Sequence, residues 1–231
     1  MFLDNINDNF IKLDNPAWNA LNETHSNFAM GGNLVKRYQP EIVAFAAFNH
    51  NNPNPQLDEI FNAGELLFII ADLPVLAKNY IVEKIVEGVQ MVCTNKIEIE
   101  TTVDIEKLTA SDDEQIMELV NEVYPGYYKS GTRLMGDYFG IKQNNKLVAM
   151  AGERIRMNNF TEISAVITHP NFGGKKFAQQ LVAHISNKNF ESGVIPFLHT
   201  EQTNERAIKI YKYLGFEHRR NINFTKIKRV K

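Results

Sequence analysis

One stretch of the chain limits its possible folds most strongly: residues 162–178, which read Glu-Ile-Ser-Ala-Val-Ile-Thr-His-Pro-Asn-Phe-Gly-Gly-Lys-Lys-Phe-Ala. The apolar first half predicts a strand, and the two glycines predict a tight turn. A helix is expected next, because Phe177, Leu181 and Ile185 recur at every fourth position. Such a strand, turn and helix direct backbone N–H groups and the positive end of a helix dipole at one spot. The segment therefore predicts an anion site.

The elements predicted after residue 98 describe a mixed α/β sheet flanked by helices. Alternation of apolar and polar residues predicts a strand at 96–103, and Ser111 with Glu114 forms a predicted capping box. Asn144 and Asn145 lie between two apolar runs and predict a hairpin. Further predicted elements are strands at 162–168, 195–200 and 223–228, and helices at 174–189 and 204–214.

The first 98 residues predict a smaller α/β lobe. Strands are expected at 65–71 and 89–93, a short helix at 56–63, and a turn-rich loop at 49–55. We therefore expect two domains, a lobe over residues 1–98 and a second domain over residues 99–231.

Composition excludes several function classes. The net charge of −2 gives no general attraction to nucleic acid, and no apolar run approaches the roughly 20 residues that cross a membrane. Met1–Asp8 lacks the pattern of a signal peptide and Cys93 is the single cysteine, so we expect a cytoplasmic protein. The histidines are scattered, so no metal is expected. Either a monomer or a homodimer is compatible with the sequence.

Residues 162–178 and 204–216 together resemble motifs A and B of the GNAT N-acetyltransferase superfamily, over roughly residues 98–231. Within it, the chain is similar to a bacterial branch related to glycine N-acyltransferase-like proteins. Segments 124–126, 150–154 and 196–199 carry that closer resemblance. The N-terminal part, with Trp18, Arg37-Tyr38 and Gln90-Met91, resembles the extra lobe of the same branch. That lobe looks like a degenerate half of a GNAT domain that shapes the substrate cleft.

The resemblance implies acetyl-CoA as the co-substrate, held mainly by backbone N–H groups at its pyrophosphate. Two positions depart from the motif: Gly173 stands where relatives have Arg or Gln, and Lys176 stands where they have Gly. The expected acetyl-CoA contacts, carried over by position, are Val166, Ile167, Thr168, Gly173, Gly174, Lys175, Lys176, Phe177, Ala178, Asn204 and Tyr211.

The resemblance also implies direct attack of a primary amine on the acyl group. Tyr211 occupies the position of the family's general acid, and Glu162 occupies a position where many relatives place a base. Glu153 is a rival for the base, and His199 is an alternative proton relay. Two other functions stay open: a CoA-binding or structural protein without catalysis, and an acyltransferase for longer acyl chains. The residue pattern does not identify the amine acceptor.

Overall fold

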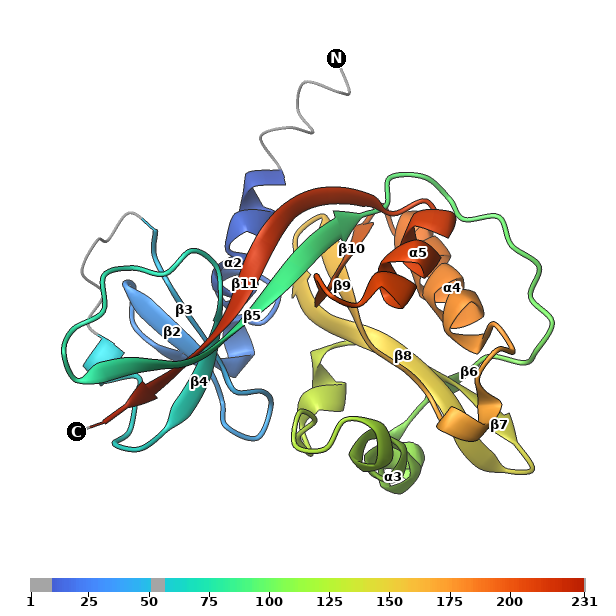
Figure 1. Cartoon of the computed structure of the whole chain (residues 1–231), viewed down its shortest axis with the longest axis horizontal. Helices are drawn as coiled ribbons and strands as arrows, with labels where there is room; N and C mark the ends of the chain where they lie inside the picture. Colours follow the sequence, from blue (N-terminus) through green and yellow to red (C-terminus); the bar gives the residue numbers. More distant parts are fainter. Residues whose placement is uncertain (1–9, 51–56, 231) are drawn as a thin grey trace, which may run out of the picture. The chain divides into compact units, whose positions relative to one another are not determined.

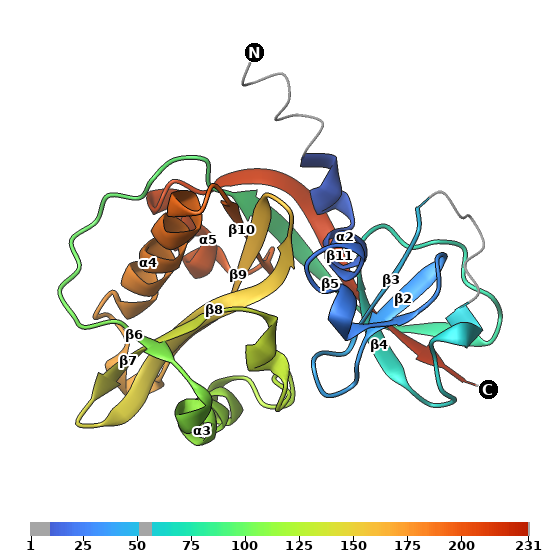
Figure 2. The same cartoon turned by 180° about the vertical axis from the view of Figure 1, so that it is seen from behind.

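The structure is a computed structural model that describes residues 10–50 and 57–230 (Figure 1, Figure 2). It divides into two compact units. Unit 1 comprises Met1–Pro40, Ala44–Val89 and Asn221–Lys231, and unit 2 comprises Glu41–Val43 and Gln90–Arg220. Two features of the sequence analysis lie outside the described residues. They are Met1–Asp8, on which the expectation of a cytoplasmic protein partly rests, and most of the predicted loop at 49–55.

Unit 1 contains a sheet in the order β1-β2-β3-β4-β11-β5, in which β3 and β4 are parallel. β11 pairs antiparallel with β4, so that Phe224 faces Ile70. The elements are η1 (Ile11–Asp14), α2 (Pro16–Asn22), η2 (Ser26–Phe28), β1 (Ala29–Gly31), β2 (Val35–Tyr38), β3 (Phe45–Phe48), η3 (Leu57–Glu59), β4 (Leu66–Ile70), β5 (Tyr80–Val92) and β11 (Glu217–Arg229). β5 and β11 each continue into the sequence of unit 2.

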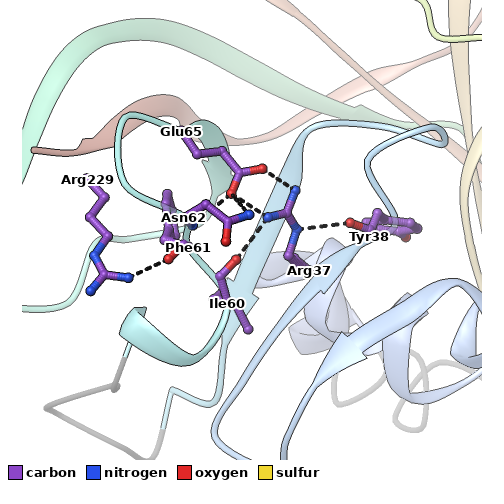
Figure 3. Close-up of polar contacts among 7 residues, drawn as sticks. All are labelled: Arg37, Tyr38, Ile60, Phe61, Asn62, Glu65 and Arg229. Atoms are coloured by element: carbon purple, nitrogen blue, oxygen red, sulfur yellow. Dashed lines mark hydrogen bonds and ion pairs between the residues drawn. The ribbon is translucent and has the colours of Figure 1, made fainter. Parts of the chain in front are cut away.

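A buried arginine fixes the turn before β4 in unit 1 (Figure 3). Arg37 is 3% exposed and forms a two-pronged ion pair with Glu65, with both N–O distances at 2.6 Å. It also donates to the carbonyl of Ile60 at 2.9 Å. Arg229 donates to the carbonyl of Phe61, the next residue. The hydrogen bonds from Arg37 lower the pKa of Glu65 against the opposing effect of burial. We interpret this cluster as a structural one, because its donors end on backbone carbonyls and one carboxylate.

Unit 2 continues with the strand order β5-β10-β9-β8-β7-β6. β9 and β10 are parallel, whereas β6 to β9 are antiparallel neighbours. In both views α3 lies on one side of β8, and α4 and α5 lie together on the other (Figure 1, Figure 2). The elements are β6 (Glu106–Leu108), η4 (Ala110–Asp112), α3 (Asp113–Val123), η5 (Thr132–Met135), β7 (Tyr138–Gln143), β8 (Lys146–Met157), β9 (Phe160–Thr168), η6 (Pro170–Phe172), α4 (Phe177–Glu191), β10 (Ile195–Glu201) and α5 (Glu205–Tyr213). The predicted mixed α/β architecture is confirmed.

The local turn signals place several of these elements correctly. Asn144 and Asn145 have φ of 52° and 62°, the left-handed values of the tight hairpin turn that joins β7 to β8. α3 packs its buried residues Ile116, Leu119 and Val120 into a cluster under β7 and β8. The predicted hairpin is therefore confirmed, and so is a helix in this part of the chain.

Three expected details are wrong. The capping box before α3 is formed by Thr109 and Asp112 rather than by Ser111 and Glu114, since Asp112 Oδ2 accepts from the Thr109 N–H at 2.8 Å. Residues 96–103 are extended without a partner strand, and the strand that opens this part of unit 2 is β6. Of the helix expected at 56–63, the described residues retain one 3-10 turn, η3.

Candidate active site

β9 and β10 separate part-way along their length. Their register pairs Phe160 with Ile195 through Ile163 with Leu198, and among the described residues this parallel pairing goes no further. β9 nevertheless continues to Thr168 and β10 to Glu201. Within the continuation, Ala165 has a φ of 50°, at a break in the β8–β9 register. Ile167 and Thr168 stay paired with β8, but on the β10 side the bulge and the missing pairs leave the stretch from Val166 to Thr168 without a partner strand, and we call this opening the gap.

The turn after β9 is open to approach. Gly173 and Gly174 are exposed, and a Cβ built on Gly174 would meet no atom within 4 Å. Gly174 has a φ of 80°, and Lys176, which precedes α4, has a φ of 59°. Lys176 thus adopts the left-handed conformation that glycine takes without strain. The turn leads into α4, whose 15 residues begin at Phe177.

The remaining predicted contacts of this turn have distinct surroundings. Lys175 places its ammonium group 5.0 Å from the ring centre of Phe172 and 6.0 Å from that of Phe177. Phe177 is buried, and Ala178 is half-buried. The Thr168 hydroxyl at the end of β9 is buried without a hydrogen-bond partner in the described structure. A buried hydroxyl in that state is suited to a ligand that enters the gap.

α5 carries the other two predicted cofactor residues. Asn204 is its N-cap, and its Oδ1 accepts from the Ala207 N–H at 3.1 Å. Tyr211 is 8% exposed, and its ring lies 6.1 Å from that of Phe216. Burial, with a smaller effect from Tyr124, raises the pKa of Tyr211 to about 12. The phenol is therefore protonated at neutral pH and can donate a hydrogen bond.

Glu162 lies at the centre of a buried polar network. Its carboxylate accepts from Arg154 Nη2 at 2.6 Å and Nε at 2.9 Å, and it lies 2.7 Å from His199 Nδ1. The other ring nitrogen of His199 lies 2.9 Å from Gln90 Nε2, and Arg219 Nη1 donates to Gln90 Oε1 at 2.7 Å. Burial raises the pKa of Glu162, but Arg154 and His199 together outweigh it and leave a pKa of about 2. Glu162 is therefore an ionised carboxylate at neutral pH.

Glu153, the predicted rival base, faces the opposite side of the sheet. It pairs with Ile163 across β8 and β9, so the two side chains share a face, and Glu162 points to the other. Glu153 is 1% exposed and accepts from the Asp137 N–H at 3.1 Å and from Lys188 of α4 at 3.4 Å. The structure thus brings Glu162 together with His199 and separates both from Glu153.

The sequence names Gln90 and residues 150–154 only through the family resemblance, and Arg219 only as part of a basic C-terminal stretch, so none of Arg154, Gln90 and Arg219 is expected beside Glu162. Glu162 and His199 were considered one at a time, because their contact depends on the pairing of two strands that are distant in sequence. An arginine eight residues before a glutamate, with the two asparagines Asn158 and Asn159 between them as a turn signal, would have indicated Arg154. Among the described residues, no three His, Cys, Asp or Glu side chains gather as a metal site requires.

The similarities to known proteins agree with this geometry. The chain matches the family described as FR47-like protein over residues 138–225. A crystal structure from Novosphingobium aromaticivorans, assigned to the GNAT acetyltransferase family, is 27% identical, with 95% of this chain and 99% of that chain covered at a TM-score of 0.87. No curated protein matches the sequence.

Two more distant structures share the fold alone. A Drosophila protein is 13% identical, with 85% of this chain and 74% of that chain covered at a TM-score of 0.63. A GNAT-family acetyltransferase from Colwellia psychrerythraea is 14% identical, with 64% of this chain and 58% of that chain covered at a TM-score of 0.53. The fold is that of the GNAT acetyltransferases, and the similarities as a whole support this superfamily for the chain.

The finer assignments remain predictions: the glycine N-acyltransferase-like branch and the degenerate N-terminal half. Within the described residues, no helix is long and apolar enough to cross a membrane.

Proposed function

We propose that the chain is an acyl-CoA-dependent N-acyltransferase that transfers acetyl from acetyl-CoA to a primary amine. The observation that carries the proposal is the gap between β9 and β10, followed by the exposed turn Gly173–Lys176 at the start of α4. The similarity to a GNAT-family structure over nearly the whole chain supports it.

The residues of the gap and turn fit this co-substrate. The side of Val166, Ile167 and Thr168 that lacks a β10 partner would bind the pantetheine arm like an added strand, with the Thr168 hydroxyl available for a hydrogen bond. The N–H groups from Gly173 to Ala178 would bind the pyrophosphate at the positive end of the α4 dipole. Asn204 would contact the same arm in addition to capping α5.

The reaction needs a proton donor for the departing thiolate and a route for the amine proton. Tyr211 would donate to the thiolate, since its phenol stays protonated at neutral pH. Glu162 is enclosed by Arg154 and His199 and has a pKa of about 2, so it is a poor acceptor for the amine proton at neutral pH. We propose that Glu162 organises the centre of the site and that the amine attacks in its neutral form, having lost one proton to solvent. As the carbon–sulfur bond breaks, the nitrogen releases a second proton to solvent, and solvent returns to Tyr211 any proton that the phenol has given to the thiolate.

Two glycines at opposite ends of α4 provide the test. Gly174 and Gly193 are both exposed, have φ of 80° and 71°, and have no atom within 4 Å of a built Cβ. Gly174→Asp places a negative charge at the proposed pyrophosphate site, and Gly193→Asp places the same charge at the far end of the helix. Calorimetric titration with acetyl-CoA should show affinity reduced by at least about tenfold in the first variant and by less than about twofold in the second.

Catalysis is tested separately by thiol release from acetyl-CoA with a panel of primary amines. Release of CoA that requires an amine supports the transferase. Tight binding of acetyl-CoA with no release of CoA in the presence of any amine would favour the non-catalytic alternative. Faster release of CoA from longer acyl-CoA compounds would favour the long-chain alternative. Equal binding by the two aspartate variants would show that the turn is not the pyrophosphate site.

A further inference from the structure

We propose that Gln90 and Arg219 are positioning residues that fix the proton of His199 on Nδ1 and thereby keep Glu162 an ionised carboxylate. The inference rests on the proposed function in one respect: it assigns these residues to the centre of the site where acyl transfer would occur. Their contacts themselves are independent of any substrate.

The direction of each hydrogen bond follows from the arginine. A guanidinium group has only donors, so the atom of Gln90 that lies 2.7 Å from Arg219 Nη1 must be its carbonyl oxygen. The amide nitrogen of Gln90 then points at His199 Nε2, 2.9 Å away, and donates to it. An accepting Nε2 carries a lone pair, so the single proton of the neutral ring is on Nδ1. That proton is donated to Glu162 Oε1 at 2.7 Å.

Burial makes these hydrogen bonds necessary, because a buried polar atom without a partner is costly. The side chains of His199 and Glu162 are 1% and 0% exposed, and Gln90 is 0% exposed. Glu162 faces the ring with Arg154 behind it, and Arg219 lies beyond Gln90. With a proton on Nδ1 and a lone pair on Nε2, the ring satisfies both of its buried polar partners.

A further neighbour of the ring is apolar. The Phe197 ring stands edge-on to His199 with centres 5.5 Å apart, and it offers no hydrogen-bond partner to either ring nitrogen. Both ring nitrogens are engaged, Nδ1 by Glu162 and Nε2 by Gln90. His199 therefore orients the carboxylate, and the side chain at position 90 determines how many protons the ring holds.

The protonation of the two His199 ring nitrogens is measured directly in the full-length chain by 15N NMR of the histidine side chains. A His199→Gln variant identifies the His199 signals. In the unaltered chain, one protonated Nδ1 and one unprotonated Nε2 are expected at neutral pH. In Gln90→Glu, the new carboxylate still accepts from Arg219 and also accepts from His199 Nε2–H, so both ring nitrogens should be protonated. Gln180→Glu alters another buried glutamine of unit 2, which bonds to Thr102, and should leave the His199 signals unchanged.

Arg219→Gln is the second variant, in case Gln90→Glu does not fold. A glutamine at position 219 can accept as well as donate, so it no longer fixes which way the Gln90 amide points. We therefore expect a mixture of the two neutral forms of the His199 ring. Two results would overturn the proposal. One is a His199 proton on Nε2 in the unaltered chain, and the other is an unchanged set of His199 signals in a folded variant at position 90 or 219.

Activity gives a second, separable readout. Gln90→Glu adds a buried ion pair at the centre of the site and so changes its electrostatics; we expect kcat to fall at least about tenfold, while the affinity for acetyl-CoA changes less than about threefold. Because the NMR measurement needs neither acetyl-CoA nor an amine, a chain without acetyltransferase activity would contradict the proposed function and leave the assignment of the proton intact.

Discussion

At the scale of single residues, Glu162 has the most unusual environment in the site. It is fully buried, and Arg154 and His199 bind its two oxygens. Its pKa falls from an ordinary 4.5 to about 2, so its charged form is favoured in the folded state. A lowered carboxyl pKa adds stability above pH 4.5, and that stability disappears as the pH falls from 4.5 towards 2.

The first prediction is therefore that Glu162 contributes up to about 3 kcal/mol of pH-dependent stability. Urea unfolding between pH 2.5 and 6 should show a shallower pH dependence for Glu162→Gln than for the unaltered chain. Glu205→Gln is the matched control, since Glu205 is an exposed partner of Lys209. Identical pH slopes for the unaltered chain and Glu162→Gln would contradict the assignment.

Tyr211 leads to a second prediction, that Tyr211→Phe slows the chemical step by roughly 10²-fold. We expect a value near the lower end of general-acid effects, because full transfer from a phenol of pKa about 12 to a thiolate of ordinary pKa is about 5 kcal/mol uphill. The hydroxyl thus acts mainly through a hydrogen bond. Single-turnover kinetics measures the step, and Tyr213→Phe, on the same helix with 71% exposure, is the control. An unchanged rate in Tyr211→Phe would exclude Tyr211 as the donor.

Lys176 gives the third prediction, which concerns strain. Its left-handed φ of 59° costs a non-glycine residue roughly 1 kcal/mol. Glycine removes this strain but gains freedom in the unfolded chain, so Lys176→Gly should change the free energy of unfolding by less than about 1 kcal/mol. Lys176→Val, with a branched side chain in the same conformation, should be clearly destabilised. Chemical denaturation of both variants checks this, and equal loss of stability in the two would refute the role of backbone conformation.

At the scale of elements, the cap of α5 positions Tyr211. Asn204 holds the first turn of a nine-residue helix through its bond to the Ala207 N–H. The fourth prediction is that Asn204→Ala lowers stability by about 1 kcal/mol, whereas Asn204→Asp, which can still accept, loses much less. Thermal and urea unfolding measure the difference. Equal losses in the two variants would mean that the cap contributes little.

The segment at 96–103 shows why one element could not be read from sequence. Its alternation is that of a strand, but its backbone is bonded by side chains of α4. Asn187 accepts from the Ile97 N–H and donates to the Ile97 carbonyl, both at 2.9 Å, and Gln180 accepts from the Thr102 N–H at 2.7 Å. A side-chain amide offers the donor and acceptor that a neighbouring strand would offer. The hairpin at Asn144 and the cap at Asn204 were predictable because their signals are local.

At the scale of the whole molecule, the strand, the turn and the two helices were predictable from two motifs, but the gap and the polar network were not. Its members come from five strands, from Gln90 in β5 to Arg219 in β11, and no sequence spacing relates them. Which residues of the five strands meet depends on strand order and register, which form only in the folded chain.

The fifth prediction concerns how acetyl-CoA would act on the two units. A ligand that binds only the native state at a hundredfold excess over Kd stabilises it by about 2.7 kcal/mol. We expect hydrogen exchange to slow at residues 164–178 of unit 2, with little change in β1 to β3 of unit 1. Free CoA should protect the same turn. Protection spread evenly over both units, or none at residues 164–178, would contradict a local site.

The pairing of β4 with β11 has a consequence for how the chain is made. Ile70 and Phe224 are partners in unit 1, yet about 150 residues are translated between them, which at 5–20 residues per second takes roughly 8–30 s. During that time the growing chain holds β4 with one edge unfilled, and an open strand edge can pair with other chains. Unit 1, although its first strands emerge from the ribosome first, completes its sheet only after nearly all of unit 2 has been synthesised.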